Sequence, residues 1–212
     1  MSDADFLSLQ QWLSPAFPVG GFAWSHGLES AIAAGDVTDG KALALWLETV
    51  LSRGSGAADA VLLTAAMEPG ADHGRLAAMA RALAGSAERH AETEAQGAAF
   101  TATHNSLTGN SFPAVPMPVA VGRAARSLSL APASVAAHYL QAFAANLVSA
   151  AVRFMPLGAT EGQAVLAELR PVILEAAARA ACTVPEDIAL SQPGADLASL
   201  FHETEPVRIF RS

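Results

Sequence analysis

The feature that most constrains the fold is an apolar pattern with the period of an α-helix. Within residues 41–54 the apolar side chains recur at intervals of three and four, which places them on one face of a helix: Leu43, Trp46, Leu47, Val50 and Leu51. No comparable run alternates as a strand does. The same reasoning predicts further helices over 5–13, 25–34, 57–67, 72–85, 86–107, 116–127, 132–155 and 160–181. We therefore expect an all-α, single-domain bundle of about eight to ten helices.

Local signals at the expected helix ends support this division. Asp39 can cap the helix that follows it, and Pro132 suits the first turn of the next long helix. Thr160 and Gln163 have the spacing of a capping box. Pro171 lies inside the last expected helix and should kink or divide it.

Composition excludes several classes of function. The 212 residues carry 12 Lys and Arg against 20 Asp and Glu, a net charge of −8, with Lys41 as the one lysine. Such a chain has no basic stripe for nucleic acid or anionic lipid. The lone Cys182, expected as a small core residue, excludes an internal disulfide. The acidic N-terminal residues lack the apolar run of a signal peptide, and no segment has the apolar length of a membrane span, so we expect a cytoplasmic protein.

The stretch "SPAFPVGGFAWSHGLE", residues 14–29, places prolines and a glycine pair before a histidine and a glutamate. It lacks the lysine and hydroxyl of a phosphate-binding loop. His26 and Glu29 would share a face if the segment is helical, a geometry that some metal sites use. A structural or interface role is favoured over a metal site, because no second pair completes four ligands. The acidic stretch "ERHAETEAQG", residues 88–97, is interpreted as a solvated helix face.

Neither a nucleophile motif nor a metal-binding histidine motif occurs, so the sequence predicts no catalytic residue, no cofactor and no metal ligand. The expected helix over 132–155 is more informative. Tyr139, Asn146 and Arg153 recur every seven residues along one edge of its apolar face, beside small residues. They fit either an internal hydrogen-bond network that fixes the helix register or a contact with another protein.

The C-terminal segment, residues 191–212, is expected to be irregular. It alternates acidic and basic groups with Phe201, Ile209 and Phe210, which a purely solvating tail would lack. Such a tail can become ordered by docking on a partner or can fold back onto its own domain. Its last residues hold few apolar groups, so we expect them to be mobile or loosely packed in the isolated chain.

Four segments in order together resemble the UreF family of urease accessory proteins: "LSPAFPVGGFAWSHGLESAIAAGDV", "ERHAETEAQG", "NLVSAAVRFMPLGATEGQ" and "HETEPVRIFRS". The family commonly carries Gln where this chain has Ala159. The resemblance implies a non-enzymatic, dimer-forming maturation factor that bridges UreD (UreH) and the GTPase UreG on apo-urease during nickel insertion, with GTP and nickel belonging to the partners.

The resemblance also implies an all-helical domain over 1–190 and a partner-docking tail over 191–212. The expected partner-binding residues are Glu29, Tyr139, Asn146, Arg153, His202, Glu203, Arg208 and Phe210. Tyr139 and Arg153 match the family's long helix near its dimer and GTPase-facing surfaces. Two other classes remain open: an all-α ligand-binding sensor domain, which would need a closed apolar cavity, and a helical metalloenzyme, which would need convergent carboxylates and histidines.

Overall fold

The computed structural model describes residues 2–212, and over that range it contains helices and no strand. The α-helices are α1 (Asp3–Trp12), α2 (Leu28–Ala33), α3 (Gly40–Arg53), α4 (Ser55–Met67), α5 (His73–Ala82), α6 (Ala87–Thr108), α7 (Met117–Ala125), α8 (Pro132–Phe154), α9 (Ala159–Glu168), α10 (Arg170–Ala180) and α11 (Pro193–His202). The all-α fold is thus confirmed. Two short 3₁₀ turns, Gly21–Ala23 and Pro185–Asp187, complete the helical elements.

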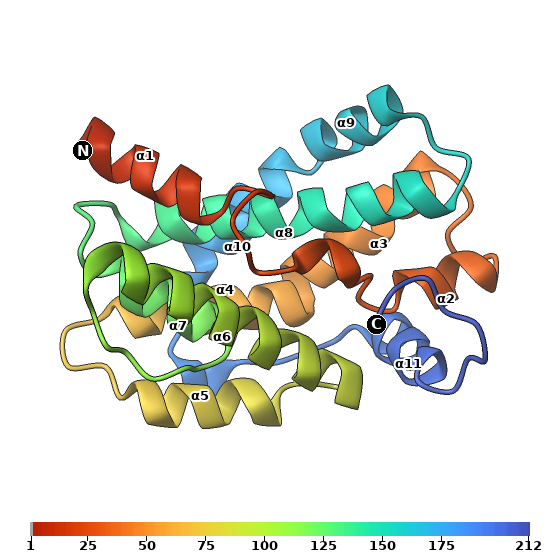
Figure 1. The fold of residues 1–212 in the computed structure, drawn as a ribbon. Coiled ribbons are helices and arrows are strands. Elements are labelled where there is room, and N and C mark those ends of the chain that lie inside the picture. Colours follow the sequence, from red (N-terminus) through yellow and green to blue (C-terminus); the bar gives the residue numbers. More distant parts are fainter. Residues whose placement is uncertain (1) are drawn as a thin grey trace.

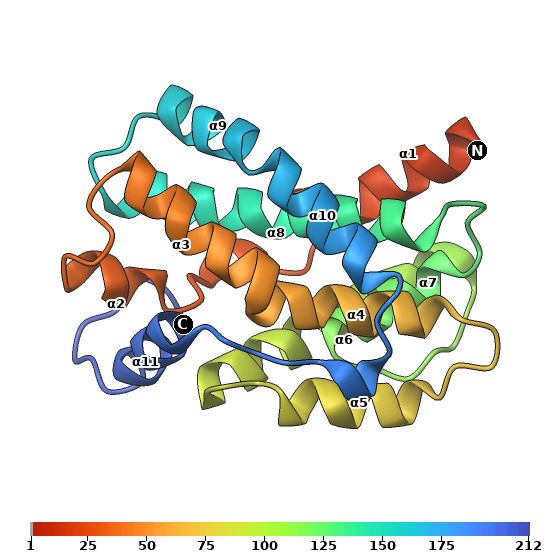
Figure 2. The same cartoon turned by 180° about the vertical axis from the view of Figure 1, so that it is seen from behind.

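The core is built around α4 and α8. Helix α4 packs against α3, α7, α8 and α10, and α8 also contacts α2, α9 and α10. Figure 1 shows α6 and α5 on one side of this centre, and the reverse view in Figure 2 shows α3 and α10 crossing the other side. All nine residues of α7 are buried between α4 and α6. Gly122 allows this close approach, because a Cβ there would collide with the Leu63 carbonyl on α4.

The helix boundaries confirm some of the local signals and contradict others. The Asp39 side chain accepts a hydrogen bond from the Ala42 N–H at 2.8 Å, and Pro132 opens α8. The chain divides at Pro171, since α9 ends at Glu168 and α10 begins at Arg170. The capping box at Thr160 and Gln163 is wrong: α9 begins at Ala159 without a side-chain cap, so Thr160 lies inside its first turn.

Two further corrections concern single elements. Residues 193–202 form helix α11 rather than irregular chain, with Ala195, Ala198, Ser199 and His202 buried on one face. Cys182 is exposed after the end of α10 and is not a core residue.

By length and composition alone, α8 could cross a membrane, with a mean hydropathy of 1.3 over its most apolar stretch. Half of that stretch is buried inside the molecule. This burial is what the central helix of a bundle requires.

Candidate functional site: two polar clusters beside the C-terminal segment

The proline and glycine loop before α2 turns sharply rather than forming the first turn of a helix. Gly20 and Gly27 have φ angles of 70° and 76°, and His26, at 62°, is the one non-glycine residue of the described chain with positive φ. Helix α2 therefore begins at Leu28 and not at residue 25, and His26 and Glu29 do not share a helix face. Gly27 has no room for a side chain, because a Cβ would meet the backbone at Ser199 of α11.

Glu29, in the first turn of α2, is the centre of what we call the outer cluster: Glu29, Glu88, His202 and Arg208. His202, at the end of α11, is fully buried. Its Nε2 lies 3.1 Å from Glu29 Oε2, and its Nδ1 lies 2.7 Å from Glu88 Oε2. The Arg208 guanidinium donates to Glu88 Oε1 at 2.6 Å. The cluster thus joins α2, α6 and α11 to the chain that follows α11.

The last residues of the chain are bound through their backbone. The N–H groups of Ile209 and Phe210 both donate to the Glu29 carboxylate at 2.8 Å. The Arg211 N–H donates to the Ala23 carbonyl, and the Ser25 N–H donates to the Ser212 carbonyl, each at 2.8 Å. Phe210 and Ser212 are buried. The expectation of a mobile or loosely packed segment is therefore wrong for this structure, and the alternative of a tail folded back onto its own domain describes it.

A second group, the inner cluster, lies deeper and consists of His26, Asp59, Arg89, Glu92 and Tyr139. Arg89 and Glu92, one turn apart on α6, form an ion pair, and the Tyr139 hydroxyl donates to Asp59 Oδ2 at 2.8 Å. Arg89 and Glu92 are both buried, so the interpretation of residues 88–97 as a solvated face is wrong for this part of it. Within that stretch His90 remains exposed.

Burial and charge act differently on the acids of the inner cluster. Burial raises the pKa of Asp59 to about 6, although Arg89 and Tyr139 oppose the shift. Burial would also raise the pKa of Glu92, but the charge of Arg89 and the proximity of His26 outweigh it and lower the value to about 2. Burial and then the charge of Arg89 lower the pKa of His26. The neutral ring has its Nε2 2.6 Å from the Ser55 hydroxyl and its Nδ1 3.5 Å from Glu92.

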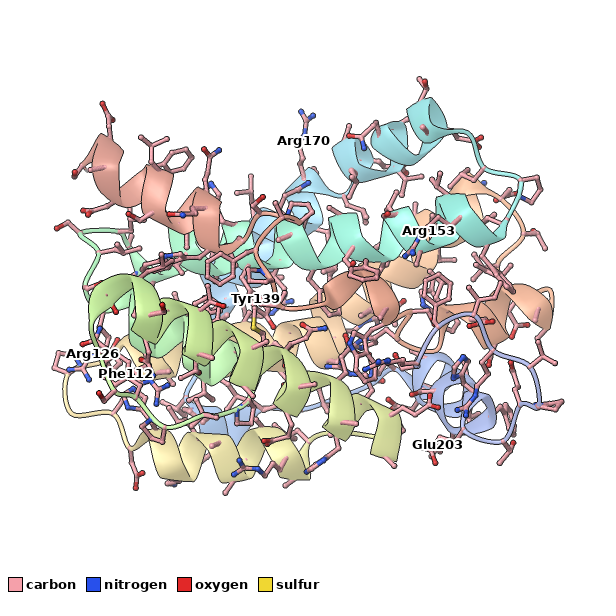
Figure 3. The ribbon with its side chains drawn as sticks, viewed as in Figure 1. Phe112, Arg126, Tyr139, Arg153, Arg170 and Glu203 are labelled. Carbon is pink, nitrogen blue, oxygen red and sulfur yellow. The ribbon has the colours of Figure 1, made fainter. Side chains whose placement is uncertain are left out.

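The polar edge of α8 is used inside the molecule. Asn146 Nδ2 donates to the Gly21 carbonyl at 2.9 Å, and Arg153 donates to the Phe22 carbonyl at 2.8 Å. The Arg153 guanidinium also lies over the Phe210 ring, 4.7 Å from its centre. Figure 3 shows Tyr139 between α6 and α8 and Arg153 further along the same helix. The internal-network interpretation is confirmed, and a protein contact for these residues stays a prediction.

Glu203 is the remaining residue of the predicted set. Its Oε1 accepts a hydrogen bond from the Ala87 N–H at 2.7 Å, so it caps the N-terminus of α6, near which Figure 3 labels it. The structure therefore brings Glu29, His202, Glu203, Arg208 and Phe210 together around one segment. Tyr139 belongs to the inner cluster, while Asn146 and Arg153 hold the loop on which the segment rests.

Sequence reasoning missed Asp59, Arg89 and Glu92. A signal was present for the two residues of α6. The buried stripe of α6 includes Thr93, Gly97 and Phe100, and continuing it towards the N-terminus with helical spacing reaches Arg89 and Glu92.

A cavity of about 190 Å³ lies between α6 and α8, beside the inner cluster. Its walls are largely apolar and include Trp12 and Phe143. The polar lining comes from Ser14, Glu92, Gln96, Tyr139, Asn146 and Ser149. Among residues 2–212, no three His, Cys, Asp or Glu side chains lie where they could hold a metal ion together.

Comparison with known proteins gives consistent matches. The model of the UreF family matches residues 37–170. The urease accessory protein UreF of Cereibacter sphaeroides strain KD131 is 56% identical over 209 residues, covering 99% of each chain. The UreF of Paracoccus denitrificans is 54% identical over 99% of this chain and 97% of its own, and that of Roseobacter denitrificans is 47% identical over 100% and 96%.

Proposed function

The chain belongs to the UreF family of urease accessory proteins, and we propose that it is a non-enzymatic maturation factor that bridges UreD (UreH) and the GTPase UreG on apo-urease. In this role it supports GTP-dependent nickel insertion in the cytoplasm as a homodimer. GTP and nickel are bound by the partners.

The observation that supports this proposal best is an apolar ridge on α11 and the chain after it. Phe201, Val207 and Ile209 are 63%, 81% and 69% exposed, and Leu197 and Leu200 add to the same segment. Large apolar side chains in such numbers on one segment are typical of a protein interface. The segment is also held in a fixed conformation by the outer cluster, which reduces the entropy lost when a partner binds. We propose that this ridge binds UreD.

The structure changes which residues of the tail we assign to direct contact. Phe210, His202 and Glu29 are buried and hold the segment in place. Arg208 is 40% exposed beyond its bond to Glu88, so it can reach a partner at the rim. In the proposal, Ile209 and Phe201 are the apolar anchors, and Phe210 acts through the position of its neighbours.

A second surface is available for the homodimer and for UreG. Arg153 and Ser149 are exposed on α8, and Phe22, 68% exposed, lies beside them at the mouth of the cavity between α6 and α8. We propose that this surface and the apolar ridge serve different partners, which is what a bridging protein requires.

The test compares two pairs of exposed apolar residues. Phe201→Ser with Ile209→Ser removes two anchors from the ridge, while Leu45→Ser with Leu174→Ser removes two residues that are 66% and 63% exposed on α3 and α10. Binding of purified UreD is measured by calorimetry or by size in solution. Loss of two interface anchors typically costs about 2 kcal/mol or more each. Only the ridge pair should weaken UreD binding, by about 1,000-fold if the two losses add. Equal UreD affinity of the two double variants would refute the assignment.

A second measurement separates the adaptor from the other two classes. The purified chain should neither bind GTP nor hydrolyse urea. Calorimetry checks GTP binding, and an ammonia assay checks urea hydrolysis. Stoichiometric metal in the isolated protein would favour a metalloenzyme. A small molecule retained in the cavity between α6 and α8 would favour a sensor domain.

A further inference from the structure

Both ring nitrogens of His202 face carboxylate oxygens. Nε2 lies 3.1 Å from Glu29 Oε2 and Nδ1 lies 2.7 Å from Glu88 Oε2, and the ring is fully buried. A neutral imidazole has one donor nitrogen and one acceptor nitrogen. An ionised carboxylate only accepts, so two such partners require a proton on each ring nitrogen.

The other contacts favour the ionised form of both carboxylates. Glu29 already accepts the N–H groups of Ile209 and Phe210 at 2.8 Å, so its two oxygens serve three donors including His202. Glu88 accepts from Arg208 through Oε1, and a proton on this acid would leave the guanidinium beside a neutral group. Two carboxylates and one guanidinium leave one negative charge, which a doubly protonated ring balances.

We propose that the outer cluster is a proton-dependent latch, in which doubly protonated His202 joins Glu29 to Glu88 and so fixes residues 203–212 in their seat. When His202 loses one proton, one carboxylate loses its imidazole donor, and the cluster keeps one negative charge that no cation balances, although Glu88 still pairs with Arg208 and Glu29 still accepts two backbone N–H groups. Such a charge is costly beside His202 and Glu29, which are both buried. The segment then loosens, because Glu29 also holds the backbone of Ile209 and Phe210.

The other charged groups near the latch have partners of their own. Helix α11 packs on α2 and α6, and the charged side chains that face His202 from those helices are Glu29 and Glu88. Glu203 caps α6, and Glu205 accepts from the Ser30 hydroxyl. On α11 itself, Asp196 accepts from Gln192 at 2.7 Å. Imidazole is the side chain that ordinarily changes charge between about pH 5 and 8, so a test of the latch has to span that range.

The latch is a property of the isolated chain, and its test needs no partner. If UreD does not bind, the latch can still be present. If the latch is absent, the apolar ridge can still dock. The two failures are therefore distinguishable.

Hydrogen exchange on the full chain tests the latch directly. The measured quantity is the protection factor of the Ile209 and Phe210 amides, corrected for the intrinsic pH dependence of exchange, from about pH 5.5 to about pH 8.5. In the unmodified protein it should fall about tenfold or more as pH rises. His138→Gln, which changes a half-buried histidine on α8, should leave this fall unchanged. A protection factor that stays constant over this range would overturn the proposal.

Two variants test the charge requirement in opposite ways. His202→Gln should give low protection at every pH, because one amide cannot donate to both carboxylates. Glu88→Gln should keep the segment protected at every pH. Its new amide can donate to Nδ1 of a neutral ring, whose Nε2–H still donates to Glu29, and Arg208 then balances Glu29. If His202→Gln fails to fold, Glu88→Gln still tests the latch. A protection factor that falls with pH in Glu88→Gln as it does in the unmodified protein would contradict the latch.

Discussion

The inner and outer clusters use the same kinds of side chain but differ in the number and exposure of their cations. The inner cluster sets one guanidinium, Arg89, against the carboxylates of Asp59 and Glu92, with Arg89 and Glu92 buried and Asp59 half-buried. The outer cluster matches two carboxylates with Arg208 and His202, and Arg208 reaches the surface.

The position of the guanidinium determines the state of each histidine. In the inner cluster, Arg89 adds to the effect of burial and keeps His26 neutral, since the pKa of its ring is lowered. In the outer cluster, Arg208 binds the far side of Glu88, so His202 meets only carboxylates. The inner cluster is thus part of the permanent core, whereas the outer one can open.

The largest expected effect comes from removing the cation of the inner cluster. Arg89→Met leaves Glu92 buried and Asp59 half-buried without their guanidinium, and breaking a buried pair such as Arg89–Glu92 typically costs about 3–5 kcal/mol. The free energy of unfolding in urea measures it. Arg81→Met is the matched control, because Arg81 pairs with Glu94 at the surface and should cost less than about 1 kcal/mol. Equal losses would contradict a structural role for the inner cluster.

The next effect is a pH dependence that belongs to Asp59. Because its pKa is raised from 3.8 to about 6, protonated Asp59 contributes stability that is full below pH 3.8 and is lost as pH rises through about 6. The shift corresponds to roughly 3 kcal/mol. Asp59→Asn should flatten the fall of the unfolding free energy between pH 4.5 and about 8.

The range of pH over which stability changes distinguishes the contribution of Asp59 from that of Glu92. Glu92, with a pKa lowered to about 2, contributes stability above pH 4.5 that is lost only as pH falls towards 2. The His202 latch acts alike in the unmodified protein and in Asp59→Asn. The difference between their profiles of unfolding free energy against pH therefore isolates the contribution of Asp59. Two profiles of the same slope would show that Asp59 stays ionised throughout.

A smaller effect is expected where the polar edge of α8 holds the loop. Asn146→Ala removes the donor to the Gly21 carbonyl, and the loss of one such hydrogen bond should lower the unfolding free energy by about 1–2 kcal/mol. Gln141→Ala is a suitable control on the same helix, since its side chain makes no hydrogen bond within residues 2–212. Similar losses in both variants would mean that helix propensity, rather than the loop contact, sets the cost.

The sequence predicted the helices well and the clusters poorly, for a common reason. A period of 3.6 is a local property, and it located α3 and the long helix α8 correctly. Helix α11 was missed because Pro193 and Gly194 at its start are typical of irregular chain, and only contact with α2 makes its buried face useful. The burial of Glu92 depends on Arg89 and on segments far away in the chain, which no local pattern contains.

The site residues were found in part, through different signals. The seven-residue recurrence of Tyr139, Asn146 and Arg153 indicated polar groups that need partners, and the structure supplies those partners inside the chain. In the C-terminal segment the alternation of charged and aromatic residues indicated a tail that can dock, and the family resemblance then supplied the individual contact residues. Their mutual contacts require the turn at His26, and positive φ at a histidine is not predictable from its neighbours.

The smallest expected effect on stability is also the one that best separates the two clusters. Arg208→Gln removes a guanidinium that is 40% exposed, and solvent screening limits the contribution of such a pair to less than about 1 kcal/mol. Global unfolding should therefore hardly change, in contrast to Arg89→Met. Locally the result should differ, because Glu88 then keeps His202 as its one charged partner and residues 207–212 should exchange their amide hydrogens faster. A loss of global stability as large as that of Arg89→Met would show that the outer cluster is as much a part of the core as the inner one, and that the segment does not open independently.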